Sequence, residues 1–276
     1  MKAHSVLLAL FLLIGYTINI VAQVDRNLRF THLTNDNGLP TNTIYSLCQD
    51  FKGFIWIATA NGLCKYDGRS ISVYEVEPTK GERKKGGIIR HVFEDKRHRL
   101  WVITHKGVNL YNRNKDNFNF VSVDSLNNFS RVIYQDDKGK IYMGGSGAFI
   151  YNEQTSKFDP FYVNQDETIT AFITAITSDQ KGQMWFGRMY GGLICADVEN
   201  GKLTRYKHND HNINSLISNK VTSLFTDHHG RIWIGTEDKG ICYFDSSTNK
   251  FIRIEGFPQI CVRTFAEDAE GNIWIG

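Results

Sequence analysis

The chain has 276 residues, of which 41% are hydrophobic and 13% aromatic, and its formal net charge is +3 at pH 7. This length is ample for a hydrophobic core, and so small a charge excludes a nucleic-acid or membrane-surface partner attracted by net charge alone. The 24 glycines and only 4 prolines suit many short strands joined by tight turns.

The first residues have the pattern of a secretory signal peptide. Lys2 and His4 precede an apolar run from Val6 to Ile14, and Ala22 is a small residue at the expected cleavage site. We therefore expect residues 1–22 to be removed on export and residues 23–276 to form the exported part. No cysteine stands at the cleavage site, which argues against a lipoprotein anchor. An uncleaved N-terminal anchor is the alternative.

One sequence unit recurs along almost the whole chain: Asp, two residues, Gly, one residue, an aliphatic residue and Trp. The complete copies are Asp50 to Trp56, Asp179 to Trp185, Asp227 to Trp233 and Asp268 to Trp274. Two copies are degenerate, with His98 in the Gly position before Trp101 and with Tyr142 in the Trp position after Asp136. The six Trp positions are 45, 41, 43, 48 and 41 residues apart, a period that matches a four-stranded propeller blade.

Each unit predicts four strands. In the fifth copy we expect them at 221–225, 231–236, 241–245 and 250–254. The predicted fold class is all-β, a β-propeller of four-stranded blades with about five and a half blades of an expected seven, preceded by the signal peptide. The repeated Trp is interpreted as a packing residue between blades, because a ligand platform would not need the same aromatic in every blade.

The complete blades are expected at about 43–76, 88–123, 130–163, 170–206 and 221–254, and a sixth begins at Cys261. Arg29 to Leu33 alternates like a strand and is followed by a turn at Asn37 to Pro40. We expect that strand to close the ring by pairing with the last blade. Because the sequence ends within the second strand of a blade, we expect residues 23–276 to be an incomplete first propeller of a longer protein. A truncated gene is the alternative.

The cysteines and histidines do not predict a metal site or a cofactor. Cys64 and Cys242 take the same position in blades one and five, which are far apart in a ring, so we expect free thiols. No two cysteines and no histidines on one element have the spacing of metal ligands. We expect no catalytic residues either, since carboxylate pairs such as Asp136 and Asp137 lie in turns.

The pattern Asp-x-x-Gly-x-Ile-Trp-Ile-Gly-Thr, with Tyr-Asp or Phe-Asp at the end of the third strand, resembles the two-component regulator propeller repeat. The opening Phe30 to Pro40 and the connector Tyr206 to Ser218 are similar to the same family. The resemblance covers about residues 24–276. It implies the periplasmic sensor part of a hybrid two-component system histidine kinase of the Bacteroidetes type.

That resemblance also implies an architecture and a cue. It implies two successive seven-bladed propellers, an immunoglobulin-like domain, a membrane helix, a kinase core, a receiver and a helix-turn-helix output domain. The implied cue is an oligosaccharide from a complex glycan, and the implied output is transcription of polysaccharide-utilisation genes. This chain would hold only the signal peptide and most of the first propeller, so the kinase and the inner-membrane anchor would lie downstream.

Two sets of residues are candidates for ligand binding. The loops between second and third strands and the connectors between blades should open on one face, the usual ligand side of a propeller. On that face Arg188 and Tyr190 could hydrogen-bond to and stack on a sugar, and His105 and Lys106 are further candidates. A solvated loop explains these four residues equally well.

The second set takes the position five residues before each turn Asp. Its members are Tyr45, Arg90, Arg131, Thr174, Thr222 and Arg263. Three arginines at one position of the innermost strands could ring the central channel and bind a carboxylated or sulfated glycan. The alternative is that they pair with nearby acids or point to water.

The function that these observations favour is a non-enzymatic periplasmic sensor module. Its expected partners are an oligosaccharide, neutral or acidic, and the downstream domains of the same polypeptide, while a homodimer stays open. No nucleic acid should bind this segment. The rivals are a secreted propeller lyase or glycosidase, and a scaffold that binds protein partners.

Overall fold

The computed structural model describes residues 31–76, 87–104, 106–123, 129–164, 167–169 and 171–276. The predicted signal peptide lies outside these residues. The chain divides into two compact units, Met1–Leu33 and Thr34–Gly276, and all described strands belong to the second. Of Arg29 to Leu33, the predicted closing strand, only residues 31–33 are described, and they form no strand.

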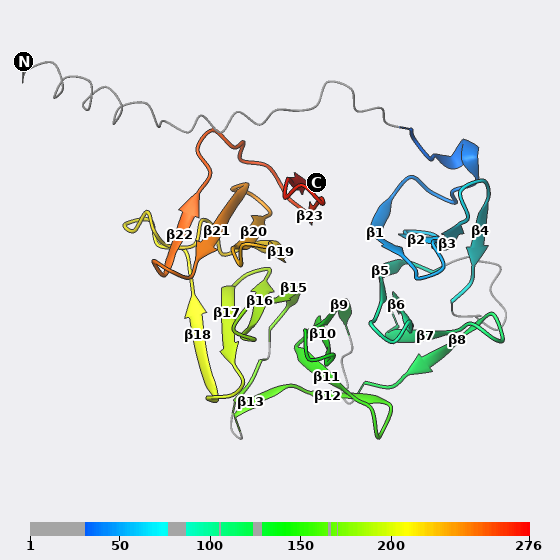
Figure 1. Cartoon of the computed structure of the whole chain (residues 1–276), viewed down its shortest axis with the longest axis horizontal. Coiled ribbons are helices and arrows are strands. Elements are labelled where there is room, and N and C mark those ends of the chain that lie inside the picture. The colour runs from blue at the N-terminus through cyan, green and yellow to red at the C-terminus, as the bar shows by residue number, and fades with distance from the viewer. Residues whose placement is uncertain (1–30, 77–86, 105, 124–128, 165–166, 170) are drawn as a thin grey trace, which may run out of the picture. The chain divides into compact units, whose positions relative to one another are not determined.

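Twenty of the described strands form five four-stranded antiparallel sheets, each with its strands in chain order (Figure 1). The first sheet consists of β1 (Ile44–Gln49), β2 (Ile55–Thr59), β3 (Gly62–Tyr66) and β4 (Ile71–Tyr74). The second consists of β5 (Ile89–Glu94), β6 (Leu100–Thr104), β7 (Val108–Asn112) and β8 (Asn117–Val121). The third consists of β9 (Ser130–Gln135), β10 (Ile141–Gly145), β11 (Ala148–Asn152) and β12 (Lys157–Pro160).

The remaining sheets continue the series. The fourth consists of β15 (Ile173–Ser178), β16 (Met184–Arg188), β17 (Gly192–Asp197) and β18 (Lys202–Tyr206). The fifth consists of β19 (Val221–Thr226), β20 (Ile232–Thr236), β21 (Ile241–Asp245) and β22 (Lys250–Arg253). A two-stranded sheet, β23 (Phe265–Glu267) and β24 (Ile273–Ile275), begins the sixth blade.

The predicted fold class is confirmed: these sheets are the blades of a partial β-propeller. In the fifth sheet every strand boundary lies within one residue of its predicted place. Two short elements were not predicted, a 3₁₀ turn η1 (Asn35–Asn37) that ends at Gly38 with φ 102°, and a hairpin of β13 (Tyr162–Asn164) and β14 (Glu167–Thr168) between the third and fourth sheets. The first precedes the first blade and runs into the predicted turn at Asn37 to Pro40, and the second lies in a connector, where the repeat pattern is absent.

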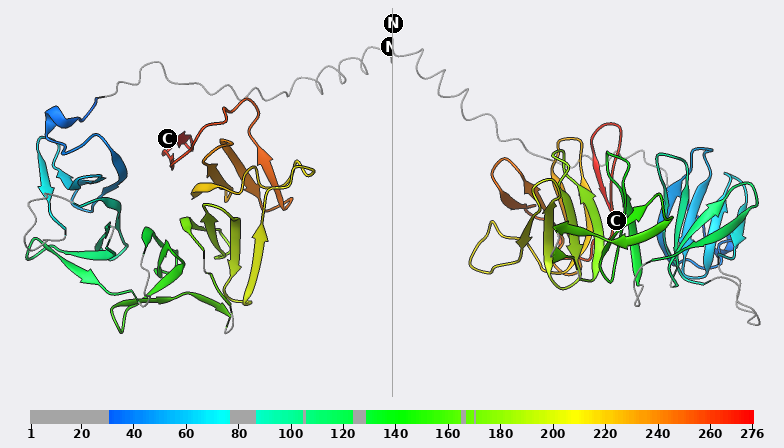
Figure 2. Two further views of the ribbon diagram at one scale, coloured as in Figure 1. Left: turned by 180° about the vertical axis from the view of Figure 1, so that it is seen from behind. Right: turned by 90° about the horizontal axis from the view of Figure 1, so that it is seen from below.

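The first strand of each sheet lies innermost, and successive sheets touch through these strands. β1 contacts β5, β5 contacts β9, β9 contacts β15, and β15 contacts β19. In residues 34–276 the sheets are therefore arranged around a common axis, as the face and edge views show (Figures 1 and 2). Side chains that leave the inner strands toward this axis can come close to one another although they are far apart in sequence.

The repeated Asp and Trp are joined by a hydrogen bond within each blade. Asp227 Oδ2 accepts from Trp233 Nε1 at 2.8 Å, while Asp227 Oδ1 accepts from the Arg231 amide at 2.9 Å. Burial alone would raise the pKa of Asp227, but the bonds from Trp233 and Arg231 outweigh it and lower this pKa. In the degenerate copies Tyr142 donates its hydroxyl to Asp136, and His98 adopts the left-handed φ of 63° that Gly has elsewhere.

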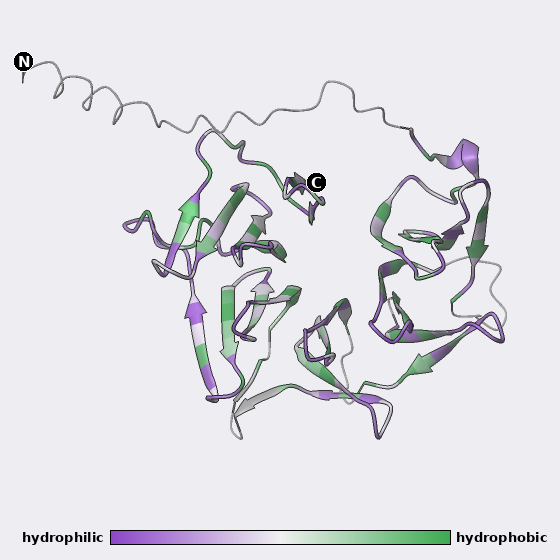
Figure 3. Ribbon diagram, viewed as in Figure 1, coloured by the Kyte–Doolittle hydropathy of each residue, from purple (hydrophilic) through white to green (hydrophobic). Residues whose placement is uncertain are grey.

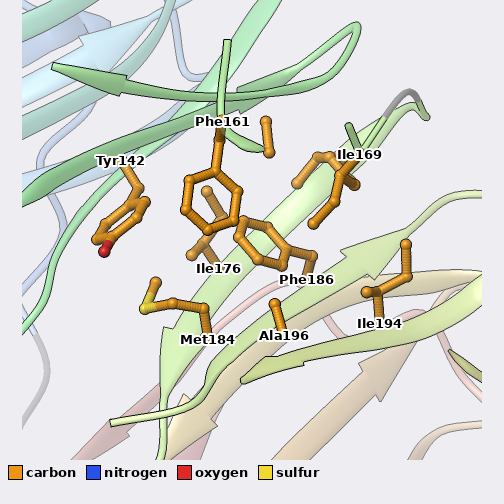
Figure 4. Close-up of a cluster of buried hydrophobic side chains, with 10 residues drawn as sticks. Tyr142, Phe161, Ile169, Ile176, Met184, Phe186, Ile194 and Ala196 are labelled. Carbon is orange, nitrogen blue, oxygen red and sulfur yellow. The ribbon is translucent and has the colours of Figure 1, made fainter. Parts of the chain in front are cut away.

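Apolar side chains fill the space between neighbouring sheets. Between the third and fourth sheets Tyr142 and Phe161 pack against Ile176, Met184 and Phe186 (Figure 4). Trp101 packs in the same way on Tyr151 and Phe158 of the next sheet, at ring-centroid distances of 4.9 and 5.8 Å. Apolar residues follow the strands, while the turns are largely polar (Figure 3). The Trp positions are structural, as interpreted from the sequence.

Candidate functional site

The inner strands all begin at the same end of the propeller. Ile44 at the start of β1 pairs with Thr59 at the end of β2, and Ile173 of β15 pairs with Arg188 of β16 in the same way. The connectors between blades and the turns between second and third strands therefore lie at one end of the sheets. We call this end the connector face.

A β-bulge interrupts every inner strand near the connector face. Pairing with the second strand skips one residue in each of the five four-stranded sheets. The skipped residues are Tyr45, Arg90, Arg131, Thr174 and Thr222. In the sixth blade Arg263 and Thr264 both donate their amides to the Gly276 carbonyl, which places Arg263 equivalently. A bulge re-aims the side chain of the extra residue, so these six side chains form a set that sequence spacing alone identified.

The threonines of this set hold neighbouring sheets together. Thr174 Oγ1 donates to the Val221 carbonyl at 2.6 Å and to the Gly187 carbonyl at 3.1 Å. Thr222 Oγ1 donates to the Val262 carbonyl of the sixth blade. At two of the six positions the bulge residue is thus explained by structure alone.

Two of the three arginines in the set stack on aromatic rings instead. The Arg90 guanidinium lies 4.9 Å from the centroid of Phe129, and that of Arg131 lies 5.8 Å from the centroid of Phe172. The two phenylalanine rings are 5.1 Å apart. A Cβ at Gly145 would lie 1.7 Å from the Phe129 carbonyl oxygen, so only glycine permits the approach that places this ring. We call Arg90, Arg131, Phe129 and Phe172 the Arg–Phe stack.

The charges of the three arginines are uncompensated in the part of the chain that the structure describes. Burial lowers the pKa of Arg131, and the positive charges of Arg90 and Arg263 lower it further. The charge of Arg263, three blades further along the chain, therefore acts on Arg131. Four other arginines pair with described carboxylates, namely Arg97, Arg99, Arg113 and Arg231, whereas no described carboxylate pairs with Arg90, Arg131 or Arg263. Arg90 Nε is buried and has no hydrogen-bond partner among the described residues.

The described loop candidates lie in two turns, Lys106 between β6 and β7, and Arg188 and Tyr190 at the end of β16 and after it. Arg188 turns back on its own loop and donates to the Gly191 carbonyl, and burial together with the charge of Arg205 lowers its pKa. Tyr190, in the same turn, is 79% exposed. The Lys106 side chain is exposed, while its amide donates to Thr104 Oγ1. His105 lies outside the described residues.

Sequence reasoning missed Phe129 and Phe172. Each stands two residues before a bulge residue, but the residue type at this position differs in the other blades, which carry Thr43, Ile88, Lys220 and Cys261. The available signal was the Phe-x-Arg and Phe-x-Thr pattern at the start of the third and fourth blades.

The remaining reactive groups are poorly placed for chemistry. All five cysteines are free thiols, and burial raises the pKa of Cys64 to about 11 and that of Cys242 to about 12. Among the described residues no group of three or more His, Cys, Asp or Glu side chains is arranged to hold a metal. The cationic and aromatic side chains at the connector face are of types suited to binding.

Comparison with protein families supports the resemblance of the repeats. Residues 38–61 and 215–238 match the family model described as two component regulator propeller. Both segments run from a connector through an inner strand to the end of the second strand. The prediction that the chain carries these repeats is confirmed. A comparison with curated proteins finds no match.

Several solved structures have a similar fold. The extracellular domain of the hybrid two-component system BT3049 from B. thetaiotaomicron is 22% identical with a TM-score of 0.61, and the match covers 89% of this chain and 40% of that one. The extracellular domain of BT4673, another hybrid two-component system of B. thetaiotaomicron, is 18% identical with a TM-score of 0.62, and the match covers 90% of this chain and 40% of that one. Virginiamycin B lyase from Staphylococcus aureus is 15% identical with a TM-score of 0.64, and the match covers 89% of this chain and 80% of the enzyme. These likenesses show the fold alone.

The chain thus spans about 40% of the length of the two sensor domains that it resembles. In the described residues there is no helix of the length and apolarity needed to cross a membrane.

Proposed function

We propose that this chain is an exported sensor module of a two-component signalling protein. In this proposal residues 1–22 direct export, residues 23–276 form part of the first propeller, and domains encoded downstream carry the membrane anchor and the histidine kinase. The observation that carries it is the match of two segments to the two component regulator propeller model. Fold likeness to extracellular domains of hybrid two-component systems supports the same class.

The ligand in this proposal is an oligosaccharide released from a complex glycan, bound at the connector face of the propeller. The aromatic and cationic side chains gathered there are of the types that stack on sugars and hydrogen-bond to them. Binding would alter the contacts of the propeller with downstream domains or with a second copy, and so change kinase output. Genes for polysaccharide use would be the regulated set.

A propeller lyase is the second candidate, favoured by the fold likeness to virginiamycin B lyase over 80% of that enzyme. A lyase or glycosidase needs acid and base groups poised on one substrate. The bulge residues on the inner strands are Tyr, Arg and Thr, of which the threonines donate to backbone carbonyls. The sensor reading therefore explains more of the connector face.

Deletion of the gene separates these candidates. We expect the deletion strain to lose the rise in transcripts of polysaccharide-degradation genes when the wild type is shifted to its inducing glycan, because the sensor is missing. A gene encoding the wild-type protein should restore the response. Unchanged transcription on every glycan tested, combined with shortening of glycan chains by the purified protein, would establish the enzyme instead.

A further inference from the structure

The Arg–Phe stack leaves specific atoms free for a ligand. Phe129 and Phe172 lie against the two guanidinium groups, so the hydrogen-bonding edges of those groups are what remains for a partner. The rings also restrict the side-chain rotamers, which lowers the entropy lost when a ligand binds. Phe172 keeps 37% of its surface exposed, so its ring can also contact a bound molecule.

Arg263 brings a third cation to the same place from the sixth blade. Its charge acts on Arg131 together with that of Arg90, and its own side chain is exposed. Three cations without a described carboxylate partner, one of them with a buried and unpaired Nε, are costly unless an anion offsets them. Their shared bulge position means that this arrangement follows from the fold and not from mobile surface chains.

Guanidinium edges match planar or tetrahedral oxyanions. An arginine binds a carboxylate or a sulfate through two parallel N–H donors, and lysine cannot reproduce this geometry. We propose that Arg90, Arg131 and Arg263, with Phe129 and Phe172, form a binding site for an oxyanion-bearing ligand, whose carboxylate or sulfate group contacts Arg131. This inference deepens the proposed sensor function and rests on it, because it assigns the acidic class of oligosaccharide to the same face.

As a binding residue, Arg131 should destabilise the ligand-free protein. Replacement by Met keeps the contact with Phe172 but removes the half-buried charge and its repulsion by Arg90 and Arg263. We therefore expect Arg131→Met to raise the Tm of the ligand-free protein by about 2 to 4 °C. A purely structural arginine would give the opposite sign.

Titration calorimetry on the purified exported region of the complete reading frame tests the site. The probes are trigalacturonate, a heparin-derived sulfated disaccharide, sodium sulfate and neutral maltotriose. We expect at least one anionic probe to bind and maltotriose not to compete with it. Arg131→Met should lower the affinity for that probe by about 10- to 100-fold. Arg253→Met, on outer strand β22, is the matched control and should bind as the wild type does. Binding of sodium sulfate as tightly as the sugars supports the site and identifies its ligand as a free oxyanion.

Several outcomes would overturn the proposal. They are no binding of any anionic probe, unchanged binding by Arg131→Met, or loss of binding accompanied by a lower Tm. If Arg131→Met does not fold, Arg263→Met on an exposed side chain takes its place, and wild-type affinity in that variant also overturns the site. A glycan-dependent transcriptional response that survives in the Arg131→Met strain would reject the anion site while leaving the sensor function in place.

Discussion

Asp95→Ala should lower the free energy of unfolding by about 3 to 5 kcal/mol, because it removes one partner of a buried charged network. Asp95 is 3% exposed. Its Oδ1 accepts from the Arg97 and Arg99 amides, both at 2.9 Å, and its Oδ2 accepts from Trp101 Nε1 at 2.9 Å and from Arg99 Nε at 2.6 Å. Alanine leaves these donors without an acceptor beside a fully buried indole. Urea denaturation of the wild type and the variant measures the difference.

The matched control for that change is Asp137→Ala. Asp137 lies in the equivalent turn of the next blade, but its side chain is 96% exposed and its nearest cation, Lys96 Nζ, is 3.6 Å away. An exposed pair of this kind contributes at most about 1 kcal/mol. Equal losses in the two variants would mean that the repeated Asp does not hold the turn and the Trp.

Acidification from pH 7 to pH 5 should destabilise the protein through His91. His91 keeps some accessible surface, yet burial of its imidazole lowers its pKa to about 4, below the ordinary 6.5 of the unfolded chain. Between these two values the unfolded state binds a proton that the folded state does not, so stability falls as the pH falls. From the two pKa values this contribution is about 2 kcal/mol between pH 7 and pH 5.

His91→Gln tests this assignment. Nδ1 of His91 accepts from the Ile133 amide at 3.4 Å, and a glutamine oxygen can accept in its place. The variant should lose most of the difference in unfolding free energy between the two pH values. His211→Gln, at an exposed connector position, should keep it. A pH dependence identical in wild type and His91→Gln would show that another group is responsible.

Most of the fold could be predicted from the repeat, because each residue of the repeat has the same structural role in every blade. Asp at the turn, Gly with positive φ and Trp at the sheet interface recur wherever the same hairpin and the same packing recur, as in Asp227, Gly230 and Trp233. Counting five residues back from the Asp also lands on the bulge residue, because the length of the inner strand is constant. What spacing could not reveal is the hydrogen bond from Trp to Asp that couples the two repeated positions.

The candidate site was only partly predictable for a related reason. Arg90 and Arg131 are on repeating strands, so their position followed from the period. Phe129 and Phe172 stand at a fixed distance from the bulge, but other blades carry other residue types there, and Arg188 turns toward a carbonyl of its own loop. Contacts made by connectors and loops depend on local backbone geometry that no repeat encodes.

The reading frame beyond the codon for Gly276 tests the central claim most directly. The account predicts that it continues through further propeller repeats, a membrane-spanning segment and a histidine kinase core, which would make this chain the input end of a two-component sensor. A frame that ends after the remaining blades of one propeller, with no membrane segment or kinase, would contradict the sensor function and favour a secreted propeller protein.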